Sequence, residues 1–142
     1  WNNGPSQTGH DFDYFPGAAW IDNVSVDSYD WWEAVYTDAD WTHKINRTPG
    51  LKTVRDFAVA HGITFSLDEG GNIHESPGGN DNPFYWQKMW EFVNDAANRP
   101  YMMWHNTYND AGAPDTLRHD FASNPNSWAY YRRFDRWGGH HF

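Results

Sequence analysis

The sequence has 142 residues, which is enough for one domain with a hydrophobic core but too few for two. Aromatic residues make up 19% of the chain, and its ten Trp could fill a core or offer flat rings on which a sugar stacks. The net charge of −9 disfavours anionic partners, so we expect neither nucleic acid nor a membrane to bind.

The first half of the chain predicts a strand, a loop, a helix and a second strand. Residues 22–29 alternate Val with small or polar residues, as a half-buried strand does. After a loop rich in Trp, Asp and Thr, we expect Thr48 to cap a helix that has Pro49 at its first position and ends at Gly62. Residues 63–68 form the second expected strand.

The second half repeats this order. A glycine-rich loop leads to a helix that Asn82 and Pro83 begin, residues 101–106 predict a third strand, and Asn124 and Pro125 open a last helix. Strands that alternate with helices are typical of βαβ units and of a parallel sheet. Because the glycine-rich loop has neither a G-x-G-x-x-G pattern nor a Walker lysine, a nucleotide-binding open sheet is disfavoured, and part of a barrel remains.

Polar and aromatic side chains follow all three predicted strands. They are Asp27 and Tyr29, then Asp68 and Glu69, then Trp104, His105 and Asn106. A barrel keeps its active site at the carboxyl ends of its strands, where these side chains would lie along one rim. Position alone leaves a second reading open, in which the two acids are a solvated strand end or a helix cap.

Alternation along a strand predicts where these neighbours point. Asp68 should turn away from Glu69, toward the helices, and His105 should turn away from Trp104. The glycines after Glu69 should let the backbone turn sharply away. Alternation therefore predicts that the two acids lie on opposite faces of the sheet.

Other residues favour structural roles. His74, Glu75 and Asp81 could form an oxygen-rich cation site, but loops rich in Asp, Asn and Gly are usually solvated turns. The chain has no cysteine, which excludes a cysteine–zinc site. We therefore predict no metal and no cofactor. Trp86 and Trp90 are expected to pack at helical spacing, and Trp31 or Trp32 could reach the cleft.

Five stretches, in this order, resemble segments of glycoside hydrolase family 26, the β-mannanase family. They are YFPGAAWIDNVSVDSYD, HGITFSLDEGG, GGNDNPFYWQKMWEFV, YMMWHNTYND and FASNPNSWAYYRRF. The second is similar to the strand that presents the family's catalytic nucleophile. There the family usually has a small or apolar residue before the nucleophile and an aromatic residue after it, whereas this chain has Asp68 and Gly70.

The resemblance implies a (β/α)8 barrel that hydrolyses β-linked polysaccharides with retention, using two glutamates. It implies that residues 1–142 are the C-terminal half of one such barrel domain, about strands six to eight, and that the N-terminal half is absent from this sequence. Glu69 then falls on the nucleophile. The acid/base glutamate, at the end of strand four in the family, would lie upstream of Trp1.

The same resemblance implies roles for the neighbours of Glu69. Tyr29 is expected to hydrogen-bond the nucleophile, and Asp27 falls on the acid of the same strand. Trp104 falls on the tryptophan that forms the floor of the sugar site. Trp1 would line a sugar subsite near the exit of strand five.

We therefore predict a secreted, retaining endo-β-glycanase, with β-mannan as the first substrate and β-1,3-xylan or mixed-linked glucan still open. Its partners would be the polysaccharide and either the missing half of the barrel or another chain. Alone, the chain should be inactive because it lacks the acid/base residue. The alternative is a noncatalytic carbohydrate-binding or scaffold protein that keeps the barrel fold.

Overall fold

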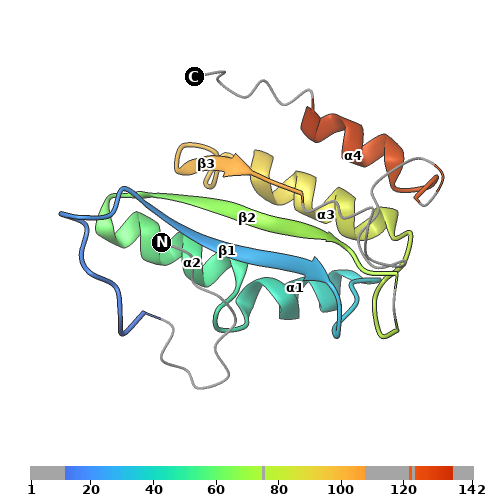
Figure 1. The fold of residues 1–142 in the computed structure, drawn as a ribbon, viewed down its shortest axis with the longest axis horizontal. Helices are drawn as coiled ribbons and strands as arrows, with labels where there is room; N and C mark the ends of the chain where they lie inside the picture. Colours follow the sequence, from blue (N-terminus) through green and yellow to red (C-terminus); the bar gives the residue numbers. More distant parts are fainter. Residues whose placement is uncertain (1–11, 75, 108–121, 123, 136–142) are drawn as a thin grey trace.

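The computed structural model describes residues 12–74, 76–107, 122 and 124–135 (Figure 1). The strands are β1 (Asn23–Asp30), β2 (Thr64–Asn72) and β3 (Met102–His105), and they form one parallel sheet in that order. The helices are α1 (Asp38–Asn46), α2 (Leu51–His61), α3 (Pro83–Asn94) and α4 (Trp128–Asp135). Parallel strands joined by helical connections confirm the predicted α/β class.

The core lies between one face of the sheet and the helices. Its buried side chains include Val24, Val26, Phe65, Leu67, Val54, Ala58, Tyr85, Met89 and Val93. Trp86 is 1% exposed, which confirms its predicted place in the core. Helix α2 lies against β1 and β2, α1 lies against α2, and α3 lies against α4 (Figure 1). Among the described residues, no helix has the length and apolar character needed to cross a membrane.

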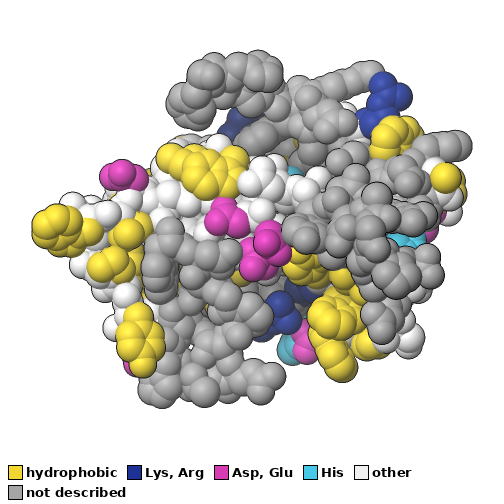
Figure 2. Space-filling view, in the orientation of Figure 1, with side chains coloured by type: hydrophobic (Ala, Val, Ile, Leu, Met, Phe, Trp, Pro, Cys, Tyr) yellow, Lys and Arg dark blue, Asp and Glu magenta, His cyan; other side chains and the backbone are white. Residues whose placement is uncertain are grey.

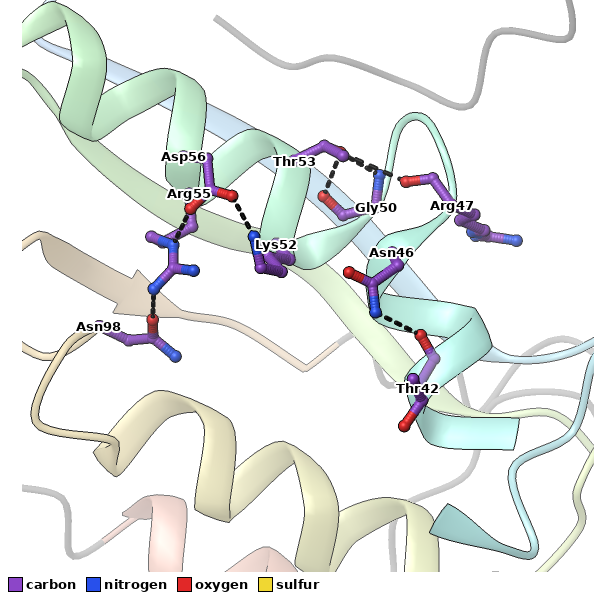
Figure 3. Close-up of polar contacts among 9 residues, drawn as sticks. All are labelled: Thr42, Asn46, Arg47, Gly50, Lys52, Thr53, Arg55, Asp56 and Asn98. Atoms are coloured by element: carbon purple, nitrogen blue, oxygen red, sulfur yellow. Dashed lines mark hydrogen bonds and ion pairs between the residues drawn. The ribbon is translucent and has the colours of Figure 1, made fainter. Parts of the chain in front are cut away.

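Helix α2 begins later than the sequence predicts, because Gly50 rather than Thr48 is its N-cap. A Cβ at position 50 would lie 2.5 Å from the carbonyl oxygen of Arg47, so only glycine fits this turn. The Gly50 N–H donates to Thr53 Oγ1 at 2.7 Å (Figure 3). At the other end, Gly62 has a φ of 67° and confirms the predicted stop.

Arg55 on α2 contacts the connection that leads into β3. Arg55 Nη1 donates to Asn98 Oδ1 at 2.6 Å, and Arg55 Nε lies 2.6 Å from Asp56 Oδ1 (Figure 3). Asn98 is buried and its Nδ2 donates to the carbonyl of Phe92 at the end of α3. The contacts thus join α2 to the connection between α3 and β3.

Helix α1 lies where the sequence analysis expects only loop. Thr37 caps it in a reciprocal capping box with Asp40, and the Thr37 Oγ1 accepts from the Asp40 N–H at 3.2 Å. Only Trp41 and Ile45 of this helix pack partly against the core. Because its apolar stripe is so narrow, hydrophobic periodicity does not reveal the helix.

Asn82 and Pro83 begin α3 as predicted. Asn82 Oδ1 accepts from the N–H groups of Phe84 and Tyr85, at 3.1 and 3.3 Å. Pro83 occupies the first helical position, where its missing N–H costs nothing. The residue just before α3 therefore accepts hydrogen bonds from two of the N–H groups in the first turn of the helix.

Asp81 holds the start of α4. Its two carboxylate oxygens accept from the backbone N–H groups of Asn126 and Ser127, both at 2.8 Å, and from Asn126 Nδ2 at 2.9 Å. Helix α4 therefore begins at Trp128, after this turn, rather than directly after Asn124 and Pro125. Partial burial would raise the pKa of Asp81, but the hydrogen bonds from Ser127 and Asn126 outweigh it and lower the pKa.

The Asp81 contacts give a pH-dependent stability. Since the folded-state pKa is lowered, the stabilisation is complete above the ordinary value of 3.8 and is lost as the pH falls through the folded-state value. Asp81→Ala should lower the free energy of unfolding by about 1–3 kcal/mol near pH 7, and the difference should shrink toward about pH 3. Denaturant unfolding measures both, in a protein that contains this chain together with the missing part of the expected barrel. Asp22→Asn, at an exposed position before β1, is the control, and an Asp81→Ala deficit that is unchanged by pH would contradict this role.

Candidate active site

A β-bulge in β2 determines the geometry of the candidate site. From Asn23 to Val26, the residues of β1 pair one to one with residues 64–67 of β2. The register then shifts by one, so that Asp27 lies opposite Glu69 and Asp68 has no partner of its own. An inserted residue of this kind changes the face toward which the following side chains point.

The bulge places both acids on the sheet face opposite the helices. Val26 and Leu67 point into the core, so strict alternation would send Glu69 toward the helices with Leu67. Instead, Glu69 contacts Tyr29, and Asp68 contacts Ser66. The prediction that Asp68 turns away from Glu69 toward the helix layer is therefore wrong, because alternation stops at the extra residue.

Glu69 is held by one short hydrogen bond. The Tyr29 hydroxyl donates to Glu69 Oε2 at 2.7 Å, from the neighbouring strand. Glu69 is half-buried, and Asp27 lies opposite it in the register. A phenol that donates to one carboxylate oxygen orients the carboxylate and leaves the other oxygen for a second contact. This is the arrangement that a carboxylate nucleophile needs.

Asp68 is the centre of a second set of hydrogen bonds. Its Oδ1 accepts from Ser66 Oγ and from the indole Nε1–H of Trp104, both at 2.8 Å. Partial burial would raise the pKa of Asp68, but hydrogen bonds from Ser25, Ser66 and Trp104 outweigh it and lower the pKa. Asp68 therefore stays ionised at neutral pH and is a poor general acid.

A second register irregularity lies in the pairing of β2 with β3. Phe65 pairs with Met102, and Leu67 pairs with His105. Between these pairs β2 has one residue, whereas β3 has two, Met103 and Trp104. Met103 and Trp104 are 39% and 38% exposed. Figure 2 shows acidic side chains over the middle of β2, with hydrophobic side chains beside them over β3.

His105 faces the helices, as the sequence predicts. Its ring meets that of Trp86 edge to face, with centroids 6.4 Å apart. Trp104, by contrast, is exposed and bonded to Asp68. The indole is thus tethered at its N–H while much of its ring remains open to solvent.

Gly70 is needed for a close approach rather than for a turn. Strand β2 continues past the acids to Asn72, so the expected sharp turn after Glu69 is wrong. A Cβ at Gly70 would lie 2.9 Å from the carbonyl oxygen of Ser28, which also accepts a 2.5 Å hydrogen bond from the Tyr85 hydroxyl. The glycine lets β1, β2 and α3 meet directly behind the acids.

Asp30, which sequence reasoning did not select, organises the loop after β1. It is fully buried and accepts from the Val35 N–H at 2.8 Å and from Asn82 Nδ2 at 2.7 Å. Burial raises the pKa of this carboxyl above its ordinary value. The loop that Asp30 closes carries Trp31 and Trp32, whose rings lie 5.2 Å apart and which are 37% and 69% exposed.

His74 and Asp81, the described residues of the possible cation site, bind the segment that leads into α4. His74 Nε2 lies 3.0 Å from Asn124 Oδ1, and Asp81 binds the start of α4, while Glu75 lies outside the described residues. Within the part of the chain that the structure describes, no group of three His, Cys, Asp or Glu side chains could hold a metal ion. Trp1 also lies outside the described residues, so its predicted contact with sugar stays a prediction.

Comparisons with known proteins link this fold to a mannanase. No protein-family model matches the chain, and no curated protein does. Among solved structures, the fold is similar to a Cellulomonas fimi endo-beta-1,4-mannanase double mutant, with a TM-score of 0.63 and 17% sequence identity. The match covers 92% of this chain and 29% of the mannanase chain. The chain therefore has the fold of part of a mannanase.

Proposed function

We propose that this chain is the nucleophile-bearing part of a retaining endo-β-glycanase that acts on β-mannan-type polysaccharide. The observation that carries the proposal is the contact of Glu69 with Tyr29 on the open face of a parallel sheet. The structural similarity to an endo-beta-1,4-mannanase supports a glycoside hydrolase of this kind. The partly exposed indole of Trp104, bonded to the neighbouring acid, supplies a ring on which a sugar can stack.

Each group has a step in the reaction. Glu69 would attack the anomeric carbon with one carboxylate oxygen, which forms a glycosyl ester as the leaving oxygen departs. Retention needs a second carboxyl about 5 Å away that protonates the leaving oxygen and later activates water. Asp68 does not fit that role, because its hydrogen bonds keep it ionised. We propose that the acid lies upstream of Trp1, where the resemblance to glycoside hydrolase family 26 would put it.

The open edges of the sheet also indicate that part of the fold lies outside this chain. In the described sheet, β1 and β3 are the edge strands, each paired on one side only. The chain spans 29% of the mannanase that it matches. We propose that residues 1–142 are the C-terminal half of a (β/α)8 barrel in a secreted protein. The preceding half, or another chain, would then cover both edges and bring the acid.

The half-barrel proposal predicts how the chain behaves alone. Open strand edges expose unpaired N–H and C=O groups, which promote aggregation. Residues 1–142 should show no cooperative thermal transition as a dilute monomer, and addition of the preceding half of the barrel should restore one. Circular dichroism, with light scattering to confirm the size of the species, measures this. A cooperative transition in a demonstrably monomeric sample contradicts the proposal.

The assignment of Glu69 predicts a specific loss and rescue. In the protein with the complete barrel, Glu69→Ala should lower kcat for mannan by at least about a thousandfold and leave oligosaccharide affinity within about threefold, since the group is needed mainly for bond-making. Azide should restore part of the turnover and give a glycosyl azide of inverted configuration.

Asp68→Ala is the matched control for the rescue. Azide should not raise its turnover, because Asp68 makes no bond to the sugar. Rescue of Asp68→Ala rather than Glu69→Ala would exchange the two assignments. Sugar binding by the unaltered protein with no hydrolysis would instead favour a noncatalytic carbohydrate-binding protein.

Loss of the Tyr29 hydroxyl should slow the reaction without preventing folding. Tyr29→Phe removes the donor to Glu69 Oε2 and should reduce kcat/KM by roughly 10- to 100-fold, the usual worth of one hydrogen bond to a charged group. Tyr36→Phe, at a 59% exposed position, should leave kcat/KM unchanged. Steady-state kinetics measures both, and equal rates for the two variants would remove Tyr29 from the site.

A further inference from the structure

Asp68 is an acid on the open sheet face to which the proposed reaction gives no step. It is the unpaired residue of the bulge, and its Oδ1 accepts from two donors. One donor, Ser66, lies on the same strand, and the other, Trp104, lies on β3. Asp68 therefore connects the nucleophile strand directly to the strand that carries the exposed indole.

The contact fixes the one polar atom of the Trp104 ring. An indole has a single N–H, which donates and cannot accept, so a bond at Nε1 defines the direction of the ring edge. Trp104 is 38% exposed, so burial in the core does not fix the position of its ring. Strand β3 has four residues and the irregular pairing described above, so backbone pairing constrains this side chain weakly.

The position of the acceptor is fixed from the other side. Asn23 Nδ2 donates to Ser66 Oγ at 2.7 Å, and Ser66 Oγ donates to Asp68 Oδ1. The bonds from Asn23 through Ser66 and the bond from Trp104 converge on Asp68, so they connect β1, β2 and β3. An ionised acceptor strengthens each bond in such a chain.

We infer that Asp68 is a positioning residue, which holds the indole of Trp104 as the sugar platform beside Glu69. This inference rests on the proposed function, because the platform serves the sugar that Glu69 attacks. Asp68 touches no reacting atom. It acts through Trp104, and the bulge that turns Glu69 onto the open face also leaves Asp68 there to hold the ring.

A double-mutant cycle in the protein with the complete barrel tests the inference. Asp68→Ala removes the acceptor, and Trp104→Phe keeps an aromatic ring but removes the donor. Each should weaken the affinity for mannohexaose, measured calorimetrically in a Glu69→Gln background, by roughly tenfold. The double variant should be no weaker than either single one, because both changes break the same contact. Asp22→Asn, at the amino end of β1, should bind as the parent does.

A spectroscopic readout separates positioning from a general effect on stability. With 15N-labelled tryptophan, the Trp104 indole N–H signal, assigned by its loss in Trp104→Phe, should shift and exchange faster with water in Asp68→Ala. Asp68→Asn keeps an acceptor oxygen at the same place, so it should fold and show a smaller shift. This variant preserves the test if Asp68→Ala does not fold.

The outcomes distinguish the two proposals. Additive losses in the double variant, or an unchanged Trp104 signal in both Asp68 variants, overturn the positioning role even if the protein cleaves mannan. A protein that neither binds nor cleaves the oligosaccharide overturns the proposed function, and a Trp104 signal that still moves with Asp68 then shows that the tether exists without a sugar platform.

Discussion

One inserted residue in β2 decides the chemistry of the open face. Up to Leu67, the strand alternates core and open-face side chains, and strict alternation would bury Glu69 among the helices. Because Asp68 is unpaired, Glu69 is rotated onto the open face, where the Tyr29 hydroxyl meets it. The indole of Trp104 is bonded to the extra residue itself, and Gly70 follows Glu69 directly.

Behind the bulge, buried polar contacts keep β1, β2 and α3 in place. The carbonyl of Ser28 accepts from Tyr85 and lies against Gly70, so a larger residue at position 70 would push the strands apart. Two residues further on, Asp30 binds both the loop of exposed tryptophans and Asn82, the cap of α3. Asn82 therefore has two roles, because it caps α3 and also binds the loop after β1.

The sequence predicts the strands, α2, α3 and the residues at the strand ends, because hydrophobic period and capping residues are local signals. It does not predict α1, whose narrow apolar stripe gives no strong period. The directions of Asp68 and Glu69 also escape it, since a bulge depends on pairing with β1 and leaves no mark in a single strand. The tether between Asp68 and Trp104 joins residues 36 positions apart, so only the folded sheet reveals it.

The central claim is that Glu69 forms a covalent bond with the sugar. In retaining hydrolysis, a mannoside fluorinated beside the anomeric carbon accumulates as a glycosyl ester, because the fluorine slows its hydrolysis. Peptide mass mapping of the complete protein treated with such a mannoside tests the claim most directly. The added mass should lie on Glu69 and disappear in Glu69→Gln. Labelling of Asp68, or of a carboxylate outside residues 64–72, would contradict it.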